Sequence, residues 1–375
     1  MLITADFDGG NIHCLDCTDP ADVRLEIAKD NASDFYQWFY FRTSQVKGQA
    51  CVYHITNAAG AAYPGGWENY RAVASYNRRD WFRVETHYDG QTLSIHHQSK
   101  HNAVYYAYFA PYSMERHADL IADLQASPRV SLDVLGRSLD GQDLDLLRVA
   151  EGEEAGKKSV WVIARQHPGE TMAEWWMEGF LHRLIDRSDA VSRALLDRAV
   201  FYVVPNMNPD GSRRGHLRTN AVGANLNREW SQATLAKSPE VYYVRERMHQ
   251  TGVDVSLDIH GDEALPYNFI AGTHGIAAWS PEREVVLERY KSTLKRLNPD
   301  FQTQYGYPPN PPGTANLGMC SNYVAQTFGC LAMTIEMPFK DTADTPDDVN
   351  GWSPSRSDRL GRSHLDALHA LMDVL

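Results

Sequence analysis

The stretch Ser159-Val-Trp-Val-Ile-Ala-Arg-Gln-His-Pro-Gly-Glu-Thr-Met-Ala-Glu174 decides the fold of this chain. Its first six residues form an apolar run of strand length, and Thr171 and Glu174 have the capping-box spacing typical of a helix start. We therefore predict that His167 and Glu170 lie on a turn between a strand and a helix. In an open α/β sheet, ligands bind at the carboxyl ends of the strands, where such turns lie.

Two later segments also end an apolar run with a polar residue. Val253–Ile259 is a strand candidate that runs into His260, and Cys330–Ile335 leads directly to Glu336. Because the carboxyl ends of parallel strands share one edge of a sheet, we expect both residues to meet the His167 turn there. Agreement of three segments on one location favours a functional site over a chance pattern.

These residue types match a catalytic zinc site. In many zinc hydrolases two His and one Glu hold the ion and leave a fourth position for water. We assign His167, Glu170 and His260 as ligands of one zinc ion per chain, and Glu336 as the general base that takes a proton from that water. Asp258 precedes His260 by two strand positions and so faces the same side. It either orients that imidazole or binds a nearby backbone group.

The segment Arg214–Trp230 lies between the ligand segments and is rich in groups that bind anions. Arg228 offers a planar fork suited to a carboxylate, and Asn227 adds an amide donor. Arg218 could face the charge that develops on a carbonyl oxygen during hydrolysis. The segment thus fits a substrate that carries a free carboxylate.

Two architectures follow one another along the chain. Up to about residue 112 the sequence is dense in aromatic and β-branched residues broken by turn signals, which is typical of an antiparallel β-sandwich. From residue 113 onward, strands alternate with helical segments, which indicates a mixed, mostly parallel central sheet between helices. We therefore expect an α/β protein with domains at 1–112 and 113–375. The amino-terminal strand candidates are Phe35–Phe41, Ala50–Ile55, Arg79–Val84, Thr92–His96 and Ala103–Phe109.

Three segments of the second part have a clear local pattern. Glu115–Gln125 is amphipathic at helical spacing, and Met172–Leu184 carries a stripe of apolar and aromatic residues at the same spacing. Such a stripe indicates a helix face packed in the core rather than a cofactor site. Ala199–Val204 is an apolar strand candidate that runs into a loop rich in Pro and Asn.

Composition narrows the function classes. The 375 residues carry a formal charge of −12, which argues against nucleic acid or an anionic membrane as partner, since both need clustered Lys and Arg. The sequence shows neither a secretory signal nor an apolar run of membrane-spanning length. Five cysteines are too few for a disulfide framework, so we expect a cytoplasmic protein in which Cys14 and Cys17 are free thiols.

Other candidate sites are weaker. His96, His97 and His101 are close in sequence, but consecutive strand residues point to opposite faces, so His96 and His97 cannot share one ion without a bulge. We expect them to be structural. Neither a G-x-x-x-x-G-K-[ST] loop nor a G-x-S-x-G elbow is present, which argues against nucleotide hydrolysis and serine esterase chemistry.

The motifs described above, together with two neighbouring ones, run in the order His167-Pro-Gly-Glu170, Asn206-Met-Asn-Pro-Asp-Gly211, Arg218, Asn225-Leu-Asn-Arg228, Asp258-Ile-His-Gly261 and Thr334-Ile-Glu-Met337. In this order they resemble the zinc metallocarboxypeptidase superfamily, and specifically a bacterial-type member of its cytosolic carboxypeptidase branch. Residues 34–42 and 106–116 are similar to the β-sandwich domain that precedes the catalytic domain in that branch. The resemblance therefore covers nearly the whole chain.

The resemblance implies zinc-dependent removal of a carboxyl-terminal residue, or of an isopeptide-linked glutamate, from a peptide or protein. The three zinc ligands keep the roles given above, and Glu336 would serve as base and proton shuttle. Arg218 would stabilise the oxyanion. Asn227 with Arg228 would bind the terminal carboxylate of the substrate.

The resemblance leaves several features of the site open. Asp262 and Glu263 stand where many members of the branch have a second His, and no basic residue is identified that would bind a glutamate side chain. The preferred terminal residue, the natural substrate, the role of the amino-terminal domain and the oligomeric state are not specified. The family also has a mobile tyrosine near the scissile bond, for which the candidates are Tyr305, Tyr307 and Tyr323.

Two other functions fit the same residues. A zinc amidohydrolase or deacylase acting on N-acyl amino acids would share the ligand spacing and the carboxylate-binding Arg. The other alternative is a peptide-binding module that binds carboxyl termini without hydrolysing them. Every proposed catalytic group is present, which favours an enzyme over the binding module.

Overall fold

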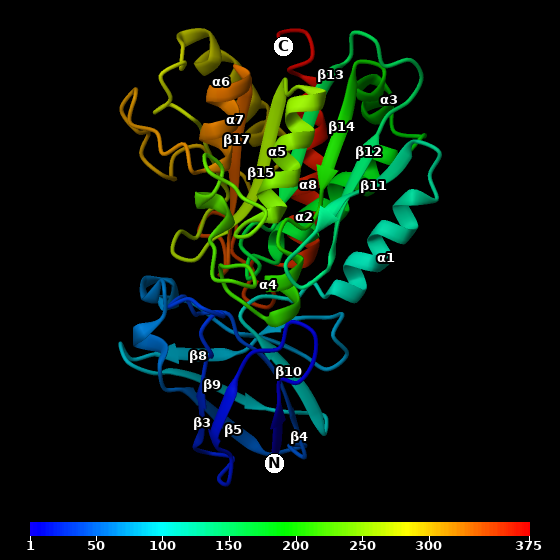
Figure 1. Cartoon of the computed structure of the whole chain (residues 1–375). Helices are drawn as coiled ribbons and strands as arrows, with labels where there is room; N and C mark the ends of the chain where they lie inside the picture. The colour runs from blue at the N-terminus through cyan, green and yellow to red at the C-terminus, as the bar shows by residue number, and fades with distance from the viewer.

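The computed structural model describes residues 1–375 and has two parts, one above the other in Figure 1. The amino-terminal part, blue to cyan, is built from β-strands, and the rest of the chain forms an α/β structure around one central sheet. No helix has the length and apolar character needed to cross a membrane.

The central sheet has seven strands in the order β11-β12-β14-β13-β15-β17-β16. The strands β14, β13, β15 and β17 run parallel to one another, whereas β11 and β12 on one side and β16 on the other pair antiparallel. The expected mixed, mostly parallel sheet is therefore confirmed. The bounds are β11 Val130–Arg137, β12 Asp143–Val149, β13 Lys158–Ala164, β14 Ala199–Val204, β15 Val255–Asp262, β16 Phe269–Ala271 and β17 Leu331–Pro338.

Helices cover both faces of this sheet because its parallel strands are apolar on both sides. Along β13, Val160 and Val162 pack into one hydrophobic cluster, whereas Trp161 and Ile163 pack into another. The helices on the first face are α1 Met114–Gln125, α2 Met172–Ile185, α3 Ala190–Leu196, α6 Pro281–Leu297 and α8 Pro354–His369. Those on the second face are α5 Pro239–Thr251 and α7 Cys320–Phe328, and a short α4, Pro209–Arg214, follows β14.

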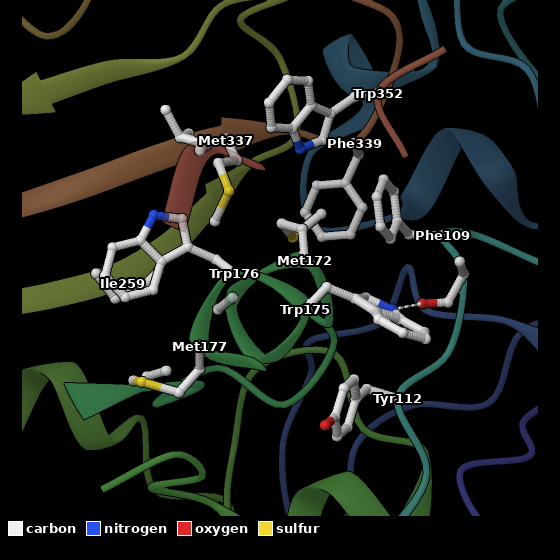
Figure 2. Packing of buried hydrophobic residues seen from close by; sticks show 14 of the residues in the cluster. Phe109, Tyr112, Met172, Trp175, Trp176, Met177, Ile259, Met337, Phe339 and Trp352 are labelled. Carbon is white, nitrogen blue, oxygen red and sulfur yellow. Dashed lines mark hydrogen bonds between the residues drawn. The ribbon is translucent and has the colours of Figure 1, made fainter. Parts of the chain in front are cut away.

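The apolar stripe on α2 lies in the core, as predicted. Figure 2 shows Met172 and Trp176 of this helix close to Ile259 and Met337 of the sheet, and all four side chains are fully buried. Trp176 also stacks on Phe180 one turn later, with ring centroids 4.9 Å apart. This packing fixes the start of α2 against β15 and β17.

The amino-terminal part is a sandwich of two five-stranded sheets, as predicted, with antiparallel pairing throughout except between β3 and β5. One sheet contains β1 Leu2–Thr4, β4 Tyr40–Ser44, β10 Ala103–Ala107, β6 Val73–Ser75 and β7 Phe82–Arg83. The other contains β2 His13–Asp16, β3 Val23–Glu26, β5 Ala50–Ile55, β9 Leu93–Gln98 and β8 Glu85–Tyr88.

Two strand predictions in the sandwich are wrong. Most of Phe35–Phe41 is not in a strand, and its polar side chains bind loops instead: Gln37 binds the backbone of Tyr63, and the Trp38 indole donates to the carbonyl of Gly9. Arg79–Val84 contributes only the two residues of β7. In both segments the aromatic residues reflect burial, which the sequence does not distinguish from strand pairing.

The two parts share one continuous core. Tyr108 of the sandwich stacks on Phe339, which follows β17, with ring centroids 4.4 Å apart. The buried guanidinium of Arg83 donates hydrogen bonds to the carbonyls of Phe339 and Trp352. A single hydrophobic cluster includes residues of both parts, so the sandwich is packed firmly against the α/β part.

Candidate active site

The turn between β13 and α2 carries His167 and Glu170, as predicted. Arg165 has the left-handed conformation, with a φ of 61°, and its guanidinium donates to the carbonyl of Pro168 and to Glu174. The capping-box interpretation is wrong although α2 does begin at Met172. The Thr171 hydroxyl donates to the carbonyl of Ala110, and Glu174 is engaged by Arg165, so neither side chain caps the helix.

The three predicted ligands converge on one point. Nδ1 of His167 lies 2.7 Å from one carboxylate oxygen of Glu170, and Nδ1 of His260 lies 2.8 Å from the other. The potential ligand atoms of the three residues all lie within 4.8 Å of one another, and all three side chains are buried. The carboxyl ends of β13 and β15 thus bring together residues that are far apart in the sequence.

The outer nitrogen of each imidazole faces an oxygen. Nε2 of His167 lies 3.1 Å from the amide oxygen of Asn225, and Nε2 of His260 lies 3.0 Å from Oδ1 of Asp258. These oxygens favour a proton on Nε2 and leave the lone pair of each Nδ1 for a metal ion. Asp258 therefore lies where it can orient His260, and its other oxygen accepts from Gln166.

The pKa shifts of Glu170 and His260 favour a positive charge at the centre of the cluster. Burial alone would raise the pKa of Glu170, but the two imidazoles outweigh it, so this pKa lies well below its usual range. Burial would lower the pKa of His260, yet Asp258 and Glu170 raise it well above its usual value. Burial and the charge of Arg218 lower the pKa of His167 to about 4. Two nitrogen donors and a carboxylate in this arrangement fit a zinc ion.

Glu336 lies beside the cluster without a strong partner of its own. It sits on β17 directly opposite His260 of β15 in the parallel register. Its Oε2 is buried and has no hydrogen-bond partner, while Oε1 lies 3.5 Å from the hydroxyl of Tyr307. Burial raises the pKa of Glu336 well above its usual range. A carboxylate of this kind is suited to accept a proton.

A cavity of about 330 Å³ opens over the cluster. All seven residues that the sequence singled out for chemistry line this one cavity, together with Tyr63 of the sandwich and Tyr307. The seven are His167, Glu170, Arg218, Asn227, Arg228, His260 and Glu336.

The two cavity arginines have different surroundings. The guanidinium of Arg218 lies over the rings of Phe35 and Tyr63, at 5.4 and 5.3 Å, and its Nε has no hydrogen-bond partner. Arg228 is more exposed and donates to the carbonyl of Asn227. Burial and the charge of Arg218 lower the pKa of Arg228. Two cations in one cavity favour the binding of an anion near them.

The structure distinguishes between the three candidate tyrosines. Tyr307 lines the cavity, and its hydroxyl donates to Asp262. Tyr305 stacks on Tyr267 with ring centroids 4.4 Å apart, and Tyr323 packs against Trp230, both outside the cavity lining. Of the three, Tyr307 alone is placed to contact a bound substrate.

Sequence reasoning missed two residues that complete the site. Asn225 lies within the quoted motif that ends at Arg228, but nothing in the motif showed that its amide faces His167. Tyr63 lies in the sandwich, where a lone aromatic residue gives no signal of a distant cavity. Among His96, His97 and His101, His97 binds the hydroxyls of Tyr106 and Tyr76 and does not converge with the other two on one point.

The mixed sheet, the converging His and Glu side chains at the carboxyl ends of its parallel strands and the unpartnered Oε2 of Glu336 together define the class of metallohydrolases. Residues 117–357 match the family model described as zinc carboxypeptidase, and residues 3–109 match that of the cytosolic carboxypeptidase N-terminal domain. The chain belongs to the zinc carboxypeptidase family and resembles its cytosolic branch. It is therefore a peptidase of the metallocarboxypeptidase type, and the resemblance read from the motifs is confirmed.

Individual relatives match most or all of this chain. An uncharacterized protein from Zymomonas mobilis is 52% identical over 100% of this chain and 97% of its own. Cytosolic carboxypeptidase 6 from Caenorhabditis elegans is 23% identical over 94% of this chain and 81% of its own.

Solved structures also match the whole chain. A metallo-carboxypeptidase from Burkholderia cenocepacia is 47% identical with a TM-score of 0.98, and the match covers 100% of both chains. A metallo-carboxypeptidase from Pseudomonas aeruginosa, in complex with (2-guanidinoethylmercapto)succinic acid, is 45% identical with a TM-score of 0.97, covering 100% of this chain and 99% of that one.

Proposed function

We propose that this protein removes a carboxyl-terminal residue from peptides or proteins with one zinc ion per chain, held by His167, Glu170 and His260. The observation that carries the proposal is the convergence of both Nδ1 atoms on Glu170 beside the unpartnered oxygen of Glu336. A zinc ion bound there would act as a Lewis acid and lower the pKa of a water molecule.

The chain's own residues perform the proton transfers in this proposal. Glu336 takes a proton from the attacking water at Oε2, the oxygen without a partner, and then gives it to the amine that leaves. Arg218 donates hydrogen bonds to the oxygen of the scissile carbonyl as negative charge develops on it. Because no carboxylate pairs with the Arg218 guanidinium, its charge is free for this role.

The substrate's terminal carboxylate would bind Arg228 and the amide of Asn227. The Asn227 oxygen already accepts from the backbone N–H of Cys320, so its NH2 group is oriented as a donor. The succinic acid derivative in the Pseudomonas aeruginosa structure carries two carboxylates, which supports a carboxylate-binding cavity in this chain as well. Tyr307 would contact the substrate near the scissile bond.

We also propose that the chain divides into a β-sandwich domain, 1–112, and a catalytic domain, 113–375. The protein acts in the cytoplasm, which is supported by its five free cysteines and by the name of the cytosolic branch.

The decisive experiment combines metal analysis with Glu336→Gln. We expect about one zinc per chain in both forms and loss of peptide hydrolysis by roughly 100- to 10,000-fold in the variant. Peptides varied at the last two positions, assayed beside short N-acyl amino acids, would identify the substrate class. A fully active Glu336→Gln protein would refute the mechanism, and a preference for acyl amino acids would favour the deacylase.

A further inference from the structure

The loop that carries Arg218, residues 213–223, is held by the amino-terminal sandwich. Gly9 donates its backbone N–H to the carbonyl of Arg213, and the Asn11 side chain donates to that of Gly215. Asn31 binds the same loop twice, through its backbone N–H to His216 and through its side chain to the carbonyl of Ala221. These contacts join residues that lie about two hundred positions apart in the sequence.

Asp30 accepts four hydrogen bonds from this loop. One carboxylate oxygen accepts from the backbone N–H of Leu217 at 2.7 Å. The other accepts from the N–H groups of Arg218 and Thr219, at 2.8 and 2.9 Å, and from the Thr219 hydroxyl at 3.1 Å. Asp30 is only 2% exposed, so water cannot replace these four bonds. Three successive N–H groups gathered on one carboxylate fix the backbone path at Arg218.

The side chain of Arg218 is also positioned from the sandwich. Its guanidinium lies over the rings of Phe35 and Tyr63, which hold it by cation–π attraction. Aromatic rings hold a guanidinium in place but leave its charge unpaired, whereas a carboxylate partner would neutralise that charge. The Arg218 charge therefore stays available to the cavity.

The loop has little freedom to move away from the sandwich. A Cβ atom added at Gly223 would lie 2.2 Å from the carbonyl oxygen of Ala32, so only glycine permits this approach of the two backbones. At Gly215, which has a φ of 72°, an added Cβ would lie 2.6 Å from the carbonyl oxygen of Gly10. The loop and the sandwich thus fit together closely on either side of Arg218.

We propose that Asp30, with Phe35, is a positioning residue for Arg218, so that the amino-terminal sandwich is an integral part of the active site. This inference rests on the proposed role of Arg218 in stabilising the oxyanion. The sandwich fixes both ends of that residue, its backbone through Asp30 and its guanidinium through the aromatic rings. Hydrolysis in the second part of the chain therefore depends on the first.

Asp30→Asn in the full-length protein is the primary test. An Asn amide has to turn its NH2 group toward at least one of the backbone N–H donors, so the loop shifts while the side-chain size is kept. We expect kcat to fall by roughly 10- to 100-fold, with KM changed less than about 3-fold, because Arg218 acts in the transition state. In the Arg218→Ala background the same change should cause no further loss.

Two further variants distinguish a loss of Arg218 positioning from a folding defect. Phe35→Leu leaves the Asp30 hydrogen bonds in place and should still lower kcat by about 3- to 10-fold, again only when Arg218 is present. Asp8→Asn is the matched control, because the Asp8 carboxylate also crosses from the sandwich, where it accepts from the backbone N–H of Met114, and makes no hydrogen bond to the Arg218 loop. It should leave kcat unchanged. Zinc content and Tm are measured for every variant.

The outcomes separate the two proposals. If Arg218→Ala retains full activity, the oxyanion role is wrong and the positioning role is wrong with it. If Arg218→Ala is inactive but Asp30→Asn keeps full kcat, or its effect adds to that of Arg218→Ala, the positioning role alone is overturned. A loss of kcat in Asp8→Asn equal to that in Asp30→Asn would likewise show general destabilisation.

Discussion

The proposed metal ligands and the residues proposed to face the substrate line the same cavity but differ in how they are held. His167, Glu170 and His260 are at most 4% exposed and lie at or just after strand ends, each contacted by a further polar group. Arg228 is exposed on a short turn, and Tyr307 is 49% exposed on a Pro-rich loop. We call the first group the ligand cluster and Arg228 with Tyr307 the exposed pair.

This difference agrees with what each group is proposed to bind. A zinc ion requires donors at fixed distances, so the ligand cluster is set by hydrogen bonds and strand pairing. A peptide terminus varies from substrate to substrate, and residues on loops can adjust to it. We therefore expect changes in the ligand cluster to abolish the reaction and changes in the exposed pair to alter its selectivity.

Removal of the metal should have the largest effect. A chelator should reduce hydrolysis to background, and stoichiometric zinc should restore it, because without a cation Glu170 only bridges two imidazoles. Zinc should also raise Tm, since an ion bound only by the folded state stabilises it by mass action. Elemental analysis checks that the treated protein is free of metal. If that protein still hydrolyses peptides, the distinction between the ligand cluster and the exposed pair is wrong.

Arg228→Ala tests the exposed pair. We expect kcat/KM for peptides with a free terminal carboxylate to fall by about 100-fold, since a charge-assisted contact is lost. Amidated peptides should be cleaved at the same low rate by both proteins. Arg289→Ala, which removes an exposed arginine on α6, is the matched control. An equal loss on both peptide types would assign Arg228 a structural role instead.

Asp258→Asn tests how the ligand cluster is supported. Its carboxylate faces Nε2 of His260, and loss of such a contact weakens metal binding by about 10- to 100-fold. Zinc-buffer titrations should show this weaker affinity, while activity at saturating zinc is largely kept. Asn225→Ala should have a similar effect through His167. Unchanged zinc affinity in both variants would show that the strands alone hold the cluster.

His117→Gln should have the smallest effect, on stability alone. Burial lowers the pKa of His117, but Glu174 and Asp145 outweigh it and raise this pKa to about 9. Because the folded pKa lies above the unfolded one, the stabilisation is complete below pH 6.5 and is lost as the pH rises through 9. Urea unfolding should show a difference of at most about 3 kcal/mol at pH 6 that shrinks at pH 10. A pH-independent difference would contradict the ionic contribution.

The sequence predicted the ligand cluster better than its surroundings. The bounds of β5 and β14 are those expected, and strand ends located His260 and Glu336, because apolar runs are local patterns. The hydrogen bonds of Asp30 and the position of Tyr63 had no local signal, since they join distant segments through tertiary contacts. The capping-box interpretation of Thr171 failed for the same reason. Its hydroxyl donates to the distant carbonyl of Ala110 instead of capping the helix.

The register of β15 and β17 places His260 and the proposed base Glu336 directly across from each other on neighbouring strands. The gap between the backbones of these two residues is therefore the spacing of two hydrogen-bonded strands, about 4.8 Å, and is not set by any loop. Loops around the cavity can diverge during evolution without disturbing that gap. New substrate preferences can thus arise in this lineage while the hydrolytic step stays the same.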